Sequence, residues 1–303
     1  MARPAPHRKE SVGDEGQVVS AHGRHYLVEF PDGTRLPCFP RGKKSDCACG
    51  DRVLVEQVAD DQGVINEIVP RQSLLYRSDA FKQKIIAANV TQVALVVASE
   101  PPFSEAVLTR CLVAAQSQDL RVLIVLNKCD LTDRLPAAEA LLAPLVALGT
   151  PVLRLTARQD ANPLRPWLAD QCTVLVGQSG MGKSTLINGL IPGARAATRE
   201  ISDALQSGKH TTTHATLYRL DDTSTLIDSP GLQEFGLAHL TRHDIEHGFP
   251  DFHPHLGQCR FRDCQHDREP DCAIRAAVAA GTLSQTRYTL FQQLAAEAGQ
   301  PTN

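Results

Sequence analysis

The sequence has no hydrophobic run long enough to cross a membrane. None of its stretches approaches the roughly 20 apolar residues that span a bilayer. The beginning of the chain, rich in Pro, Arg and Lys, also lacks the apolar core of a signal peptide. These absences predict a cytoplasmic protein with no membrane partner. With 303 residues, 42% of them hydrophobic and 21% charged, the chain is expected to form about two or three compact units.

A strong net charge is also missing. The formal net charge is -3, which argues against broad, nonspecific binding to nucleic acid, so any RNA contact has to be local and shaped. The nine cysteines are scattered and make poor candidates for a disulfide framework inside a cell, so clusters among them are first tested as metal ligands. Cys47 and Cys49 share a loop, but no second pair is near enough in the sequence to complete a tetrahedral site, and we expect ordinary turn cysteines.

The chain divides into three parts by pattern. Short β-branched runs at 16–20, 25–30, 52–55 and 63–65 predict an all-β barrel of the OB type within residues 1–74. Its basic loop, 40–44, either contacts an RNA backbone or is simply a solvated turn. Residues 75–240 then alternate between strand and helix, and residues 241–303 are rich in His, Cys and Arg before a final helix predicted at 284–298. The fold class is therefore multi-domain α/β.

The middle part predicts a doubly wound α/β domain. Continuous apolar runs at 93–97, 122–126, 152–155 and 173–176 are typical of parallel strands buried on both faces. Helices are expected at 104–117, with Ser104 as its cap, at 137–148 and at 163–169. Ligands of such domains bind at the carboxyl ends of the strands.

A phosphate-binding loop follows the strand predicted at 173–176. The run 177–184 matches G-x-x-x-x-G-K-S and leads into a helical stretch, which is the context that this motif requires. Its backbone N–H groups are expected to surround phosphate oxygens, with Lys183 on the β- and γ-phosphates and Ser184 on Mg²⁺. The expected GTP-binding residues here are Gly177, Gln178, Ser179, Gly180, Met181, Gly182, Lys183, Ser184 and Thr185.

A guanine-reading motif follows the strand predicted at 122–126. Residues 127–130 read N-K-x-D and consist of Asn127, Lys128, Cys129 and Asp130. A carboxylate at Asp130 can accept from guanine N1–H and N2–H, whereas adenine would leave it unpaired at a cost of about 1–3 kcal/mol or more. Alone, this run could be a helix-capping turn, but the phosphate loop in the same domain favours the guanine site. Thr156 and Ala157, after the next strand, fit the segment that supports the guanine carbonyl.

The order of these motifs is inverted. In most GTPases the phosphate loop opens the domain and N-K-x-D comes near its end, whereas here N-K-x-D comes first. A circular permutation explains this order, and it is feasible because domain termini usually lie close together on the surface. The sequence thus predicts a circularly permuted P-loop GTPase domain.

The remaining nucleotide-site residues are expected in two later segments. Asp228, in D-S-P-G, supplies a carboxylate on the Mg²⁺ side, and the Gly231 N–H can sense a γ-phosphate. The threonine-rich loop 208–214 is the candidate first switch, in which Thr213, favoured over Thr212, would complete the Mg²⁺ shell. The position after Gly231, where many GTPases carry a water-orienting glutamine, is Leu232, so an unaided enzyme should be slow.

A substitute for that glutamine has to come from elsewhere. His210 in the threonine-rich loop is the candidate catalytic residue that orients water, although a structural role stays open. Gln233 is less favoured because its side chain should point away.

The C-terminal part contains a candidate metal site. Its four ligands are packed in the pattern C-x4-C-x-H-x5-C and are Cys259, Cys264, His266 and Cys272. Three thiolates and one imidazole match a closed tetrahedral Zn²⁺ site with a structural role. So small a module builds little core of its own, and the metal would contribute directly to its folding.

Taken together, these motifs and their order resemble the RsgA (YjeQ) family of ribosome small-subunit-dependent GTPases, over nearly the full chain. The resemblance implies an OB barrel that binds RNA, a permuted GTPase and a C-terminal, mostly helical zinc module. It also implies slow GTP hydrolysis that is faster on the small ribosomal subunit, a role late in maturation of that subunit through assembly factor release and checking of the decoding region, and a hydrolytic role for His210. The expected partners are GTP or GDP and the small subunit with its rRNA, and we expect a monomer.

Two other functions stay open on the sequence. A permuted GTPase could serve the large subunit or a step of translation. Alternatively, the chain could be an RNA-binding protein that holds a nucleotide without hydrolysing it. Hydrolysis rates with purified small and large subunits would separate these possibilities.

Overall fold

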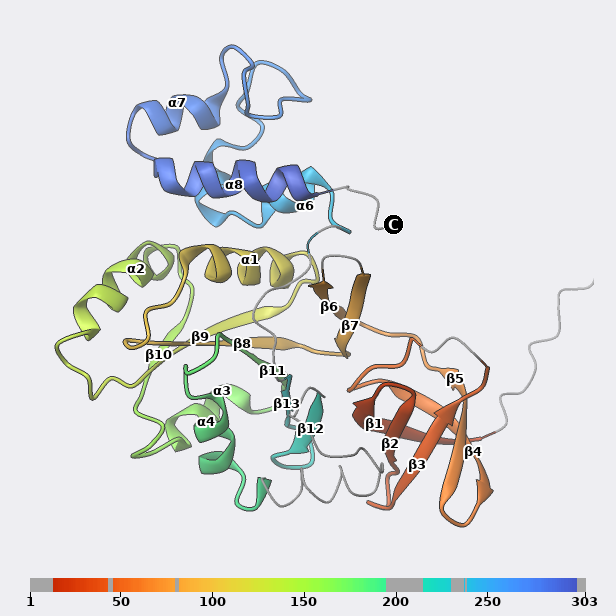
Figure 1. The fold of residues 1–303 in the computed structure, drawn as a ribbon. Coiled ribbons are helices and arrows are strands. Elements are labelled where there is room, and N and C mark those ends of the chain that lie inside the picture. The colour runs from red at the N-terminus through yellow and green to blue at the C-terminus, as the bar shows by residue number, and fades with distance from the viewer. Residues whose placement is uncertain are drawn as a thin grey trace, which may run out of the picture.

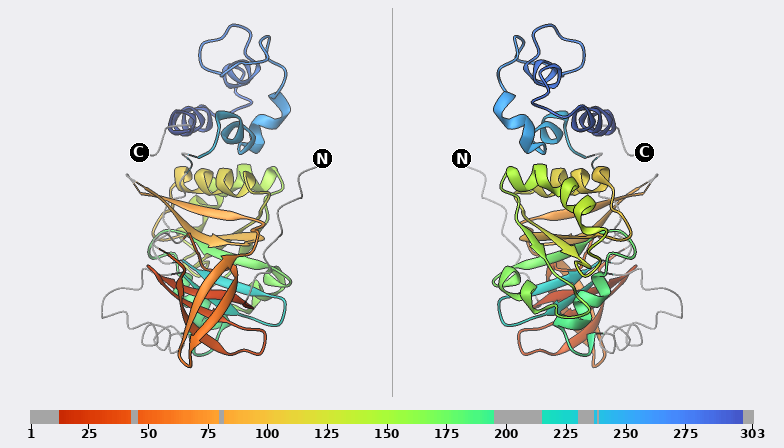
Figure 2. Two further views of the ribbon diagram at one scale, coloured as in Figure 1. Left: turned by 90° about the vertical axis from the view of Figure 1, so that its right-hand side faces the viewer. Right: turned by 90° about the vertical axis from the view of Figure 1, so that its left-hand side faces the viewer.

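The structure is a computed structural model that describes residues 13–42, 46–79, 82–194, 215–229, 237 and 239–298. A β-barrel, an α/β domain and a helical C-terminal module follow one another along the chain (Figure 1). The barrel and the C-terminal module lie on different sides of the α/β domain in every view (Figure 2). This arrangement confirms the predicted multi-domain α/β class.

The N-terminal barrel is closed. Its strands are β1 (Asp14–His22), β2 (His25–Glu29), β3 (Arg35–Pro40), β4 (Arg52–Ala59) and β5 (Gln62–Ile68). Strand β1 pairs with both β2 and β4, and β3 pairs in parallel with β5, so no edge within the barrel is left unpaired. Alternate residues such as Val53 and Val55 fill its core together with Tyr26. The OB-type barrel is thus confirmed, although β3 had not been predicted.

The α/β domain is built on a sheet with the order β10-β9-β8-β11-β13-β12. Its elements are β8 (Gln92–Ala98), α1 (Glu105–Gln116), β9 (Arg121–Asn127), α2 (Leu135–Ala147), β10 (Val152–Arg154), η1 (Asn162–Leu164), α3 (Arg165–Leu168), β11 (Cys172–Val176), α4 (Lys183–Leu190), β12 (Thr216–Arg219) and β13 (Thr225–Asp228). All pairings are parallel except β12 with β13. Helices α1 and α2 cover one face and α3 and α4 the other (Figure 1), which explains why every residue of β8 is buried.

The predicted helix cap at Ser104 is wrong in its mechanism. Ser104 does occupy the N-cap position of α1, but its side chain makes no capping hydrogen bond. Its backbone N–H instead points to Gln178 Oε1 at 3.4 Å, beside the phosphate loop. The Ser104 carbonyl oxygen still accepts the first hydrogen bond of α1, from the N–H of Leu108 at 3.1 Å, so the residue begins the helix through its backbone and not through its hydroxyl.

Two features that join the barrel to the α/β domain were not predicted. A hairpin of β6 (Leu74–Asp79) and β7 (Lys82–Ala88) lies between them in the chain. In addition, β1 of the barrel pairs antiparallel with β12, through Ser20 and Thr216, so that the barrel and the central sheet form one continuous sheet. Such long-range pairing leaves no local signal in the sequence.

The C-terminal module consists of α6 (Arg242–His247), η2 (Pro250–His255), α7 (Ala273–Ala279) and α8 (Gln285–Glu297). It stacks over α1 (Figures 1 and 2). Phe249, Phe252 and Phe291 are fully buried and form its small core, with ring centroids 5.0–5.7 Å apart. Within the described residues, no helix is long and apolar enough to cross a membrane.

Candidate nucleotide site and metal centre

A cavity of about 900 Å³ opens beyond the carboxyl ends of β9, β11 and β13. This is where a doubly wound sheet is expected to bind its ligand. Most of the predicted nucleotide-site residues that the structure describes line this cavity, namely Asn127, Lys128, Asp130, Thr156, Ala157, Gly177, Ser179, Gly180, Gly182, Lys183, Ser184, Thr185 and Asp228. Segments that are far apart in the sequence therefore meet around one space.

The phosphate loop connects β11 to α4. Gly177, Gly180 and Gly182 all have positive φ angles, of 151°, 83° and 97°, which side chains rarely adopt. A Cβ at Gly182 would overlap the side-chain amide of Asn127. The glycines thus permit both the curl of the loop and its close approach to the N-K-x-D segment at Asn127.

The ammonium group of Lys183 lies inside the phosphate loop. Its Nζ donates to the carbonyl oxygens of Gly177 at 2.5 Å and Gln178 at 3.0 Å. Burial lowers the pKa of Lys183, and the nearby Asp228 carboxylate partly opposes this shift. Burial likewise raises the pKa of Asp228, which the Lys183 charge partly offsets. A half-buried cation and a half-buried carboxylate therefore face the same cavity, which suits a ligand that combines phosphates with a divalent cation.

Asn127 of the N-K-x-D segment makes hydrogen bonds to both the phosphate loop and the 156–157 segment. Its buried side chain donates from Nδ2 to the carbonyl oxygen of Met181 at 2.9 Å, in the phosphate loop. Its Oδ1 accepts from the N–H of Ala157, also at 2.9 Å. Sequence reasoning had assigned Asn127 to the base alone, and the geometry adds a role in holding the phosphate loop and the 156–157 segment together.

The other residues of N-K-x-D are held by short local contacts. Thr156 accepts from the N–H of Asp130 through Oγ1 at 3.2 Å, which leaves the exposed Asp130 side chain at the cavity. Lys128 has a φ of 60° and donates from Nζ to the carbonyl oxygen of Glu100 at 2.6 Å. Cys129 points its thiol toward the carbonyl oxygen of Leu126 at 3.2 Å, away from the cavity. Cys129, Gln178 and Met181 are therefore the described members of the predicted set that do not line the cavity.

Part of the predicted site lies outside the described residues. This part comprises His210, Thr212, Thr213, Gly231, Leu232 and Gln233. Their roles in Mg²⁺ coordination, phosphate sensing and hydrolysis stay predictions.

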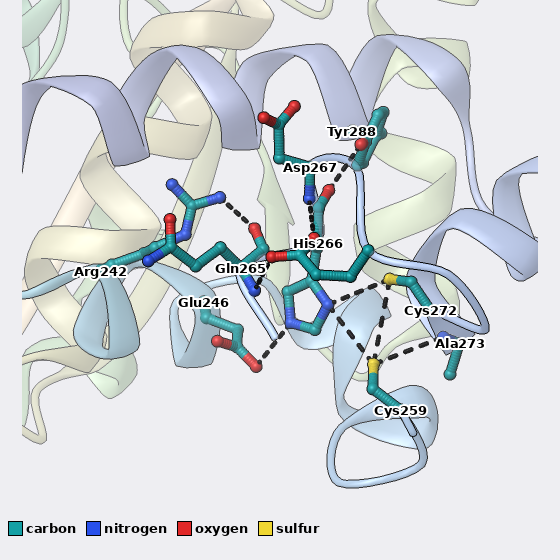
Figure 3. A network of polar contacts seen from close by, with 10 residues as sticks. Arg242, Glu246, Cys259, Gln265, His266, Asp267, Cys272, Ala273 and Tyr288 are labelled. Carbon is teal, nitrogen blue, oxygen red and sulfur yellow. Dashed lines mark hydrogen bonds and ion pairs between the residues drawn. The ribbon is translucent and has the colours of Figure 1, made fainter. Parts of the chain in front are cut away.

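The four predicted metal ligands come together in the C-terminal module, and Figure 3 shows three of them, Cys259, His266 and Cys272. The ligand atoms of Cys259, Cys264, His266 and Cys272 all lie within 4.8 Å of one another. His266 Nδ1 is 3.5 Å from Cys259 Sγ and 3.3 Å from Cys272 Sγ, and the two sulfurs are 3.9 Å apart. Ligand atoms around tetrahedral zinc are separated by about 3.5–3.8 Å, as follows from its bond lengths. The donor set and its spacing therefore fit Zn²⁺.

The surroundings of the cluster were not predicted. Glu246 of α6 places a carboxylate oxygen 3.1 Å from His266 Nε2, which leaves Nδ1 to face the sulfurs. Tyr288 of α8 donates to the carbonyl oxygen of His266 at 2.6 Å, and the N–H of Ala273 points to Cys259 Sγ at 3.3 Å (Figure 3). Partners of this kind orient metal ligands, and their loss typically lowers metal affinity about 10- to 100-fold. The α6 sequence carries no pattern from which Glu246 could have been singled out.

The fold and the cavity together define a circularly permuted P-loop GTPase that carries a barrel and a C-terminal module with a cluster of three cysteines and one histidine. The RsgA GTPase family model matches residues 68–238. A small ribosomal subunit biogenesis GTPase RsgA from Burkholderia pseudomallei is 54% identical over 304 aligned positions, which cover 99% of this chain and 96% of that protein. The chain belongs to the RsgA GTPase family and is a GTPase.

Two solved structures share this fold. The crystal structure of YjeQ from Thermotoga maritima has a TM-score of 0.71 at 30% identity and covers 94% of this chain and 98% of its own. The crystal structure of YloQ, described as a circularly permuted GTPase, has a TM-score of 0.67 at 27% identity and covers 97% of each chain. The predicted permutation is thereby confirmed.

Proposed function

We propose that this chain hydrolyses GTP in a late step of small ribosomal subunit maturation, as a cytoplasmic monomer. The observation that carries the proposal is its 54% identity, over 99% of its length, to a protein described as a small ribosomal subunit biogenesis GTPase. The cavity supports the same conclusion because it combines a phosphate loop with a guanine-type N-K-x-D segment.

In this proposal the cavity residues bind Mg²⁺ and GTP. The loop 177–185 surrounds the phosphates, Asp130 reads the guanine base, and Asn127 keeps these two parts in register through Met181. Ser184 and Asp228, with Thr212 or Thr213, would hold Mg²⁺, which neutralises phosphate charge when it is bound. Gly231 would sense the γ-phosphate and His210 would orient the attacking water.

In the same proposal, the barrel and the C-terminal module both bind the small ribosomal subunit. We assign residues 1–74 to an RNA-binding barrel, 75–240 to the permuted GTPase and 241–303 to a zinc module, whose Zn²⁺ is held by the Cys259, Cys264, His266 and Cys272 cluster. Bound GTP favours the conformation that binds the small subunit. The subunit then completes a weak catalytic site, and hydrolysis of GTP lets the chain dissociate from the subunit. The rate of GTP hydrolysis thus sets how long the chain stays on the maturing subunit.

The proposal is tested by the rate of GTP hydrolysis with purified ribosomal subunits. Small subunits should raise the slow intrinsic rate, while large subunits should not. The Asp130→Asn variant serves as a specificity control and should lose GTP affinity with little change in folding, because its side chain is exposed at the cavity. Equal stimulation by both subunits, or hydrolysis of ATP as fast as GTP, would contradict the proposal.

A further inference from the structure

Strand β12 contacts the nucleotide cavity and the barrel at the same time. Tyr218 lines the cavity, whereas the next residue, Arg219, reaches Glu29 and Gln17 of the barrel. Successive side chains of a strand point to opposite faces, so four residues of β12 are enough to touch both regions. Any shift of this strand moves both contacts together.

The backbone of β12 is paired along both of its edges. Thr216 pairs with Asp228 of β13 on one side and with Ser20 of β1 on the other. The hydroxyl of Ser20 also donates to the carbonyl oxygen of Ala215 at 3.4 Å. One row of paired residues, Ser20, Thr216 and Asp228, therefore runs across the sheet from the barrel to the carboxylate that faces Lys183.

The carboxylate of Glu29 binds the barrel to β12 through an ion pair with Arg219. Glu29 is 5% exposed, and its carboxylate accepts hydrogen bonds from Arg219 on Oε1 and from Arg35 of β3 on Oε2, the latter at 2.8 Å. Burial raises the pKa of Glu29, but the hydrogen bonds from Arg219 and Arg35 outweigh it, so the pKa lies below its usual range. Glu29 is thus a charged group, and one of its two partners belongs to the barrel and the other to the GTPase.

We propose that Arg219 is a positioning residue that couples the barrel to the nucleotide site. When the barrel engages the small subunit, the Arg219 and Glu29 ion pair transmits the displacement to β12, and thereby to Tyr218 and Asp228. Coupling of this kind is reciprocal, so the bound nucleotide changes the affinity for the subunit by the same factor. The inference rests on the proposed function and names the contact through which its timing operates.

The measurement compares two dissociation constants for the full chain and purified small subunits. One is taken with a non-hydrolysable GTP analogue and Mg²⁺, the other with GDP, and allosteric factors are typically about 5- to 150-fold. In Arg219→Gln the ratio of the two constants should fall to near one. Arg35→Gln is the matched control because it removes a bond to the same carboxylate but lies within the barrel, and it should keep the parent ratio.

Arg219→Lys gives an intermediate test that does not depend on the glutamine variant folding. Lysine keeps the charge but cannot also reach Gln17, which Arg219 contacts at 3.3 Å, so the ratio should lie between the parent and Arg219→Gln. Melting curves and nucleotide affinities without subunits show that each variant is folded.

The outcomes separate this inference from the proposed function. A full parent ratio in both Arg219 variants would overturn the inference alone. A parent chain that binds small subunits equally with the GTP analogue and with GDP would overturn the timing function, and this inference with it.

Discussion

The barrel and the C-terminal module are attached to the α/β domain by different physical means. The barrel extends the central sheet through backbone pairing at β12, which borders the nucleotide cavity. The C-terminal module instead packs side chains on α1, through Arg287 to Thr109 and Arg110 to Glu297. Since α1 supplies none of the cavity-lining residues, we expect perturbations of the C-terminal attachment to spare nucleotide binding, and perturbations of the barrel attachment to change how strongly a bound nucleotide affects subunit binding.

The largest expected effect follows loss of the metal cluster. Cys264→Ala removes one of the four clustered ligands, and because structural zinc contributes about 10–16 kcal/mol to small modules, the C-terminal module should unfold. GTP affinity should stay near that of the parent, while stimulation of hydrolysis by the small subunit should be lost. Zinc content, GTP affinity and stimulated turnover measure this, with Cys47→Ala, outside the cluster, as the control. Parent-like stimulated turnover would refute the prediction.

A large effect is also expected at Arg287. This side chain is 8% exposed, contacts both oxygens of Asp251 at 2.7 and 3.1 Å, donates to Thr109 at 2.6 Å and lies 4.6 Å over the ring of Phe249. Arg287→Gln leaves Asp251 without its cation and should cost about 3–5 kcal/mol of stability. Chemical denaturation should show a weakened C-terminal transition with unchanged GTP binding. A fall in GTP affinity of similar size would show that this attachment also reaches the nucleotide site.

A moderate effect is expected at Gly248, where the module lies against Val113 of α1. A Cβ at Gly248 would lie 2.7 Å from Cγ2 and 2.8 Å from Cα of Val113, so Gly248→Ala forces the module away at a cost of about 1–3 kcal/mol. Gly50→Ala is its counterpart at the barrel attachment, where the added Cβ would overlap the carbonyl oxygen of Ala88 and lie 3.4 Å from Cδ1 of Ile227 in β13. Both should lower thermal stability, but only Gly50→Ala should also weaken the link between subunit binding and nucleotide, because it displaces the barrel from the central sheet. Equal effects of both variants on that link would remove the distinction.

The smallest effect is expected at the partly exposed ion pair between Arg110 of α1 and Glu297 of α8. Arg110 and Glu297 form a two-bond ion pair at 2.7 and 2.8 Å, but the Glu297 side chain is 47% exposed. Arg110→Gln should therefore cost roughly 0.2–1 kcal/mol, and less at high salt. Melting temperatures at low and high salt measure this, and a loss that is independent of salt would mean that the pair acts through packing and not through charge.

The parts of the molecule that could be predicted are those encoded locally. The phosphate loop, N-K-x-D and the Cys and His cluster are short motifs whose chemistry dictates their spacing, and the buried parallel strands are continuous apolar runs. Strand β3 (Arg35–Pro40) contains two prolines and had no clear alternation, so it was missed.

The contacts between distant segments could not be predicted. The brace from Asn127 to Met181 and Ala157, the carboxylate of Glu246 behind His266, and the Arg219 to Glu29 ion pair each join residues whose local sequence is unremarkable for the role. They arise when the fold brings side chains together, and a single sequence records no trace of that proximity. The motifs therefore identify the chemistry, whereas the tertiary contacts determine how the parts influence one another.

The pairing of β1 with β12 has a consequence for synthesis of the chain. Ser20 leaves the translating ribosome early, but its partner carbonyl at Ala215 follows 195 positions later. Because β1 also pairs with β4, the barrel can close on its own and persist as an early folded unit. The edge of β1 that pairs with β12 therefore stays unpaired until most of the polypeptide has been synthesised. Because β12 also supplies Tyr218 to the nucleotide cavity, the cavity is completed when β12 covers this edge.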